Sequence, residues 1–151
     1  MALDTHSILD PIRAHAAALG VFDTVGGHEP KRAPGTGLTF ALWVDRINPI
    51  PSSGLTSTSI RFTVLGRIYG PMLAEPQDEI DPGLVEATDL FLNSLHGDFQ
   101  LDDLVTAVDL LGQSGSAMAG QAGYIKLGDG LYRVMDIDIP VIIADAWEQV
   151  P

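Results

Sequence analysis

The chain has 151 residues, no cysteine and a formal net charge of −12 at neutral pH. A chain of this length can form one domain with its own hydrophobic core, and its 46% hydrophobic content excludes a disordered or fibrous protein. The lack of cysteine excludes disulfides and thiolate metal sites, and the acidic balance argues against simple binding to nucleic-acid phosphates. No apolar run reaches the length of a membrane span and no basic segment opens the chain, so we expect a soluble, untargeted protein without a membrane partner.

The acidic residues are concentrated in one interval of the sequence. Between Arg67 and Lys126 there is no lysine or arginine. This interval forms either a solvated surface that aids solubility, or a surface that repels DNA or meets a basic partner. Its acidic residues are Glu75, Asp78, Glu79, Asp81, Glu86, Asp89, Asp98, Asp102, Asp103 and Asp109.

The first predicted element is a helix that ends just before Gly20, a residue suited to the position after a helix C-terminus. Pro11 leaves two possibilities for its start. Either Asp10 caps a helix that begins at Pro11, or the helix begins at Thr5 and is kinked at the proline. We expect a helix with an irregular start. Its apolar face is formed by Ile8, Ile12, Ala16 and Leu19.

Two strands and two loops follow this helix. Residues 21–25 form a short strand candidate, and residues 26–37 form a loop with glycine or proline at both ends. Residues 38–47 are rich in β-forming, apolar side chains and are expected inside the sheet. Residues 48–57 form a second loop of turn-forming residues. The first loop contains the only adjacent basic pair, Lys31 and Arg32.

The clearest strand covers residues 58–69, where apolar and polar side chains alternate. Gly66 on the apolar face indicates a bulge or a close helix. Two arginines and a tyrosine on the other face predict contact with water or with a partner. The apolar face consists of Ile60, Phe62, Val64 and Ile68. The second face consists of Arg61, Thr63, Leu65, Arg67 and Tyr69.

A second helix is predicted after this strand. Asp81 suits its N-cap, Pro82 suits its first position, and Gly97 ends it. This helix is expected to cover the apolar face of the sheet. Its apolar stripe consists of Leu84, Val85, Thr88, Phe91, Leu92 and Leu95.

The last third of the chain predicts three strands. Residues 104–111 form the first of these strands, with successive side chains on opposite faces, and residues 112–120 form a loop of small side chains. Two further strands are joined by the tight turn at residues 128–130, because glycine and aspartate tolerate the positive φ of short hairpin loops. The alternation breaks at Ile139 and Pro140, and a short apolar return follows.

These elements predict a single α+β domain over residues 1–151. Their order is one helix, three strands, one helix and three strands. Because the strands connect mainly through hairpins, the sheet is expected to be largely antiparallel, with both helices on one face. The loops at about 26–37, 48–57 and 112–120 are expected to be mobile.

The search for catalytic chemistry finds little. No nucleophile elbow and no phosphate-binding loop occurs, and no cofactor is predicted. The histidines are scattered along the chain as His6, His15, His28 and His96. Asp136 and Asp138 place two carboxylates on one strand face, which is consistent with a hard metal or an acid–base pair. An exposed strand face is the simpler explanation, and we expect no metal site and no enzymatic activity.

The sequence instead contains charged and aromatic residues suited to protein interfaces. An acidic segment and an arginine-bearing strand in one subunit allow head-to-tail pairing around a closed ring. The candidate residues for contacts with another subunit or a tube are Lys31, Arg32, Arg61, Arg67, Tyr69, Asp136 and Asp138.

Four stretches of the chain carry a resemblance to a known family. They read LDTHSILDPIRAHAAALGVFDTV, LWVDRI, PMLAEPQDEIDPGLVEATDLF and YRVMDIDIPVIIADAWEQV, and they extend nearly from end to end. In content and order they resemble the tail terminator proteins of long-tailed actinobacteriophages, which are related in fold to the tail terminator of phage lambda.

The resemblance implies a structural role in the virion, for a protein made in the host cytoplasm. Such proteins form rings, typically hexameric, that cap the major tail tube protein, stop its polymerisation and present a surface to the head connector or stopper protein. DNA passes through their lumen without specific binding. We therefore expect an acidic lumen surface formed by Glu75, Asp78, Glu79, Asp81, Glu86 and Asp89.

Two alternatives stay open at this point. The first is another neck component, such as a tail completion or head–tail joining protein. The second, from a different class, is a small acidic enzyme that uses Asp136 and Asp138.

Overall fold

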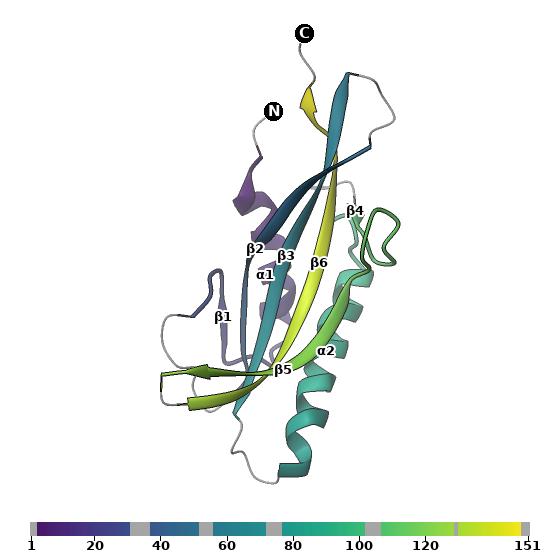
Figure 1. Cartoon of the computed structure of the whole chain (residues 1–151). Coiled ribbons are helices and arrows are strands. Elements are labelled where there is room, and N and C mark those ends of the chain that lie inside the picture. The colour runs from purple at the N-terminus through teal and green to yellow at the C-terminus, as the bar shows by residue number, and fades with distance from the viewer. Residues whose placement is uncertain are drawn as a thin grey trace.

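A long, curled sheet forms the front layer of the molecule, and two helices lie behind it in the computed structural model (Figure 1). The structure describes residues 3–30, 37–51, 56–71, 77–101, 107–128 and 130–148. Its elements in chain order are α1 (Thr5–Ala18), β1 (Thr24–Gly26), β2 (Thr39–Ile50), β3 (Ser57–Pro71), the 3-10 turn η1 (Gln77–Glu79), α2 (Ile80–His96), β4 (Ala107–Val108), β5 (Ala119–Leu127) and β6 (Gly130–Glu148).

The sheet is built around the pairing of its two longest strands. The strand order is β1-β2-β3-β6-β4, and β5 also pairs with β6. β1 is parallel to β2, and every other pairing is antiparallel. The β3–β6 register runs from Pro71 opposite Tyr132 to Ser57 opposite Glu148. The predicted α+β class with a mostly antiparallel sheet is therefore confirmed.

β6 is longer than the sequence pattern predicts. The chain does not break at Pro140, because β6 continues as one strand to Glu148. Proline fits extended backbone and removes only one donor, while its carbonyl still accepts. Here the Pro140 carbonyl accepts the Asp109 N–H at 2.8 Å. The expected separate return after Ile139 is therefore wrong.

α1 begins at Thr5, which is the earlier of the two predicted starts. The Asp4 carboxylate accepts the backbone N–H of Ser7 at 3.3 Å and its hydroxyl at 2.6 Å, and so caps the helix. The hydroxyl bond lowers the pKa of Asp4. Pro11 lies inside the helix, so the alternative of a start at Pro11 is wrong. Gly20 has a φ of +71° and ends the helix region as predicted.

α2 has a different first turn and a slightly rotated apolar face. It begins at Ile80 after η1, so Asp81 lies in the first turn and is not the N-cap. Val85 is 55% exposed, which contradicts its predicted place in the stripe, and Ala87 takes that place. The buried residues of α2 are Leu84, Ala87, Thr88, Phe91 and Leu95.

The main core lies between the helices and the back of the sheet. The rings of Phe40 and Phe91 join the two layers, with centroids 4.8 Å apart. Gly66 makes room for this contact, because a Cβ there would lie 3.2 Å from the Phe40 ring. Gly66 was expected to mark a bulge or a close helix, but the register shifts lie elsewhere, between Val44 and Arg46 in β2 and between Thr58 and Ile60 in β3. The apolar face of β3 contributes Phe62, Val64 and Ile68 to this core.

A smaller apolar cluster lies on the front of the sheet. The predicted β5–β6 hairpin is present, but Gly130 belongs to β6 and lies opposite Leu127 and is not part of the turn; Gly128 has the positive φ that the turn requires. Asp129 lies outside the described residues. Side chains from the hairpin pack onto β2 and β3 and cover Tyr69 completely. This cluster consists of Ala41, Tyr69, Val134, Trp43, Ile125, Leu127 and Tyr132.

The predicted loops differ from the observed connections. Residues 48–50 belong to β2 and residue 57 to β3, so the second loop is shorter than expected. Gly26 belongs to β1, and β5 includes residues 119 and 120 of the third loop. The strand predicted over residues 104–111 is observed as β4 alone, and residues 102–106 lie outside the described part. No helix in the described residues is long and apolar enough to cross a membrane.

Candidate functional site

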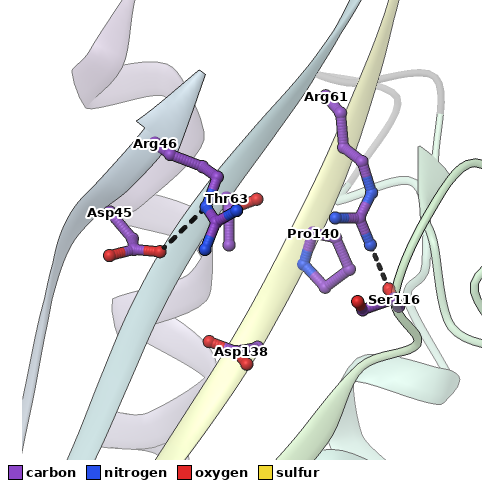
Figure 2. A pocket seen from close by; sticks show the side chains of 7 residues that line it. All are labelled: Asp45, Arg46, Arg61, Thr63, Ser116, Asp138 and Pro140. Carbon is purple, nitrogen blue, oxygen red and sulfur yellow. Dashed lines mark hydrogen bonds and ion pairs between the residues drawn. The ribbon is translucent and has the colours of Figure 1, made fainter. Parts of the chain in front are cut away.

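The front face of the sheet brings several predicted site residues into two charged networks. The first is centred on Arg61 of β3. Its guanidinium donates to the carbonyl of Ser116 (Figure 2), and its Nε lies 3.7 Å from the Asp109 carboxylate. Asp109 also accepts the backbone N–H groups of Gln113 and Ser114 at 2.8 and 2.9 Å. Arg61 therefore ties β3 to the segment that leads into β5.

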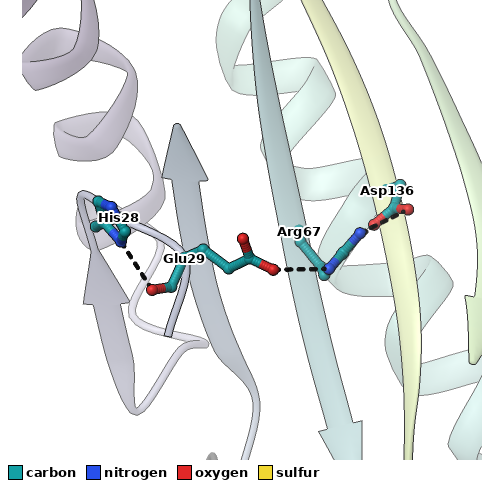
Figure 3. Close-up of polar contacts among 4 residues, drawn as sticks. All are labelled: His28, Glu29, Arg67 and Asp136. Atoms are coloured by element: carbon teal, nitrogen blue, oxygen red, sulfur yellow. Dashed lines mark hydrogen bonds and ion pairs between the residues drawn. The ribbon is translucent and has the colours of Figure 1, made fainter. Parts of the chain in front are cut away.

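The second network is centred on Arg67, six residues further along β3. Its Nε and one terminal nitrogen bind the Asp136 carboxylate at 2.5 and 3.2 Å (Figure 3). The other terminal nitrogen lies 3.8 Å from Glu29, which follows β1. The register places Arg67 directly opposite Asp136. The pair is therefore a two-point contact fixed by the strand pairing.

Aromatic rings enclose the Arg67 guanidinium. Its central carbon lies 5.3 Å from the Trp43 ring centroid and 5.9 Å from that of Tyr69, within range of cation–π attraction. The hydrogen bonds to Asp136 raise the pKa of Arg67 above its usual value. Burial raises the pKa of the Tyr69 phenol. Of the two predictions for this face, contact with water is wrong at Tyr69, which is fully buried, and only 14% of the Arg67 side chain is exposed.

Asp136 and Asp138 have different surroundings although they share a strand face. Asp136 is held by Arg67, while Asp138 lies opposite Leu65 and is exposed. Within the described ranges, no three histidine, aspartate or glutamate side chains gather closely enough to hold a metal ion. The geometry gives Asp136 a structural role as the partner of Arg67.

The predicted acidic surface is partly described. Asp78 and Glu79 of η1 are exposed, as are Asp81, Glu86 and Asp89 of α2. Because the buried stripe of α2 faces the sheet, these carboxylates lie on the side of the helix away from the core. Glu75, Lys31 and Arg32 lie outside the described residues.

Sequence reasoning missed a polar contact between the helices. His15 of α1 lies with Nδ1 2.5 Å from the Ser94 hydroxyl and Nε2 2.8 Å from the Asp98 carboxylate. The three residue types are those of a catalytic triad. However, Ser94 lies within α2, where neighbouring backbone N–H groups bond inside the helix and form no oxyanion hole. The contact therefore links α1 to α2, and its separation of about 80 positions left no signal in the sequence.

No family model fits the chain, and no curated protein is similar to it. The family resemblance therefore rests on the quoted sequence stretches, and the interface roles of Arg61, Arg67, Asp136 and Asp138 stay predictions.

A double-mutant cycle tests the Arg67–Asp136 contact. Arg67→Met leaves a half-buried carboxylate without its partner, so we expect the free energy of unfolding to fall by about 1–3 kcal/mol. The combined Arg67→Met/Asp136→Asn variant should lose less than the sum of the two single changes. Arg46→Met, which removes an exposed pair with Asp45, is the control and should cost less than about 0.5 kcal/mol. Additive losses in denaturant unfolding would contradict the contact.

Titration of the tyrosines tests the burial of Tyr69. Its raised pKa means that the folded state disfavours the phenolate. The associated stability is intact below the ordinary tyrosine pKa, about 10, and is lost as the pH rises through the raised pKa. We expect the last phenolate absorbance step to disappear in Tyr69→Phe and to persist in Tyr124→Phe, whose side chain is exposed. A last step that survives in Tyr69→Phe would show that another tyrosine is the buried one.

Proposed function

We propose that this protein is a phage tail terminator. In this role it caps the tail tube as a ring of identical subunits, stops polymerisation of the major tail tube protein, and offers a docking surface to the head connector. The proposal includes a virion location at the tail–neck junction and a non-enzymatic mechanism. It also includes the finer fold expectation that the order of helices and strands, with both helices on one sheet face, is that of this family.

The observation that carries the proposal is the resemblance of four ordered stretches that together extend over most of the chain. The mixed α+β class with a mostly antiparallel sheet agrees with the fold that the resemblance implies. The enzyme alternative is weakened because Arg67 engages one carboxylate of the suggested pair at 2.5 Å. A structural protein does not need a group of side chains arranged around a catalytic centre.

The charge of the protein supports a role for the exposed acidic surface. Asp78, Glu79, Asp81, Glu86 and Asp89 lie on η1 and on the outward side of α2. If this surface lines the lumen of the ring, repulsion of like charges lets DNA slide without binding.

Electron microscopy of the purified protein with tail tubes tests this function. We expect rings, predicted to be sixfold, at one end of the tubes, with the acidic surface toward the lumen. Rings with the carboxylates on the outer rim and a basic lumen would contradict the lumen proposal alone. Tubes that never carry the protein would contradict the function.

Phage that lack the protein separate the nearest alternative. Overlong or unattached polymerised tubes are the result expected for a terminator. Tails of normal length that fail to join heads would indicate another neck component, such as a tail completion or head–tail joining protein. Activity lost in Asp136→Asn/Asp138→Asn with unchanged assembly would instead support the enzyme alternative.

A further inference from the structure

A small hollow of about 60 Å³ opens on the front face of the sheet, between the side chains of Arg46 and Arg61 (Figure 2). Strand register explains its position. Arg46 of β2 lies opposite Thr63 of β3, which lies opposite Pro140 of β6. The Pro140 ring and Ser116 line the hollow on the side of Arg61. The hollow is therefore fixed by three paired strands and is not a gap between loops.

Two buried polar atoms at this hollow have no hydrogen-bond partner among the described residues. They are the Thr63 hydroxyl and the Arg61 Nε, of which the second has an ion pair with the Asp109 carboxylate at 3.7 Å but no hydrogen bond. Thr63 is only 5% exposed, and the Arg61 side chain is 12% exposed. A buried polar group without a partner is costly, and native proteins generally satisfy such groups with protein, water or ligand. Both residues line the hollow, so its occupant must accept hydrogen bonds.

The wall of the hollow also contains carboxylates, which need hydrogen-bond donors. Asp138 lines the hollow, and it has no ion pair with any described residue. Asp45 completes the wall and forms only an exposed contact of 3.4 Å with Arg46. Arg46 is paired with Asp45 and Arg61 with Asp109, so the groups of the wall left for an occupant are the Asp138 carboxylate and the Thr63 hydroxyl. An occupant that suits them is uncharged and presents a donor and an acceptor side by side.

We propose that this hollow binds the carboxamide group of an asparagine or glutamine side chain presented by a protein partner. The amide oxygen accepts from Thr63 and Arg61, and the amide nitrogen donates to Asp138. The volume of about 60 Å³ exceeds the roughly 10–15 Å³ that one water molecule needs, so the hollow has room for a small group such as a carboxamide. It is too small for the α-carbon and its substituents, which therefore remain outside, as a partner's backbone does.

Charged groups fit the same wall less well. A carboxylate satisfies the donors but is repelled by Asp138 and Asp45. An ammonium group pairs with those aspartates but offers no acceptor to the Thr63 hydroxyl and adds a third cation to the wall. A carboxamide avoids both conflicts. The inference concerns the chemistry of the hollow and holds whether or not the protein forms rings.

Three probes of similar size test the inference on the full-length protein by NMR. Acetamide, acetate and methylammonium are titrated, and the backbone amide signals of Thr63 and its neighbours are followed. We expect acetamide to bind with a Kd on the order of 1–100 mM, as four heavy atoms allow, and the two ions to bind at least several-fold more weakly. N-acetylglutamine methylamide should bind at least as well as acetamide.

Two variants locate the binding. Thr63→Val keeps the shape but removes the hydroxyl, and it should weaken acetamide binding about five- to tenfold, as loss of one hydrogen bond does. Asp138→Asn changes an exposed position that tolerates substitution, and it should weaken binding similarly if Thr63→Val does not fold. Thr24→Val on β1 is the control and should leave the Kd unchanged.

Several results would overturn the inference. Tighter binding of acetate or methylammonium would assign a different ligand class. The absence of any shift with acetamide would mean that the hollow holds water only. Binding of acetamide but not of the capped glutamine would exclude a protein side chain as the source, and unchanged affinity in both variants would place the binding elsewhere.

Discussion

The pairing of β3 with β6 is the constraint on which the rest of the structure depends. Fifteen residues of β3 lie against nineteen of β6, and all other strands pair with this pair directly or through β2. Because side chains alternate between the two faces, a slip of one residue would turn Phe62, Val64 and Ile68 away from the helices. The hydrophobic core and the charged front face are therefore two consequences of one register.

The strand register also determines which charged side chains contact each other. It places Arg67 opposite Asp136, which converts two candidate interface residues into a contact within the subunit. It brings Thr63 between Arg46 and Pro140, which creates the hollow with its unpaired donors. The front face thus combines ion pairs, which rigidify the sheet, with the buried hydroxyls of Thr63 and Tyr69, which have no hydrogen-bond partner among the described residues. On the acidic side of α2, Asp81 accepts from Arg133 of β6 at 2.9 Å.

Sequence reasoning predicts the parts of this fold that depend on local patterns. The alternation over residues 58–69, the end of α1 at Gly20 and the hairpin after β5 follow from side-chain spacing and backbone preference. The burial of Tyr69 and the contacts of His15 depend on segments distant in sequence, so no local pattern reveals them. Pro140 misled the prediction because proline is a strong breaker in general but costs little where its carbonyl alone is needed. The hollow could not be predicted, since three strands must first be placed in register.

The register can be measured directly because the chain has no cysteine of its own. Leu65 and Asp138 lie opposite each other on the accessible front face, whereas Leu65 and Asp136 are diagonal neighbours. Directly opposite residues meet the distance limits of a disulfide, and diagonal Cα atoms, roughly 7–8 Å apart, generally do not. We expect Leu65→Cys/Asp138→Cys to form an intramolecular disulfide readily under mild oxidation and Leu65→Cys/Asp136→Cys to remain largely reduced. Preferential crosslinking of the second pair would contradict the register, and with it the assignment of residues to the core, the Arg67 network and the hollow.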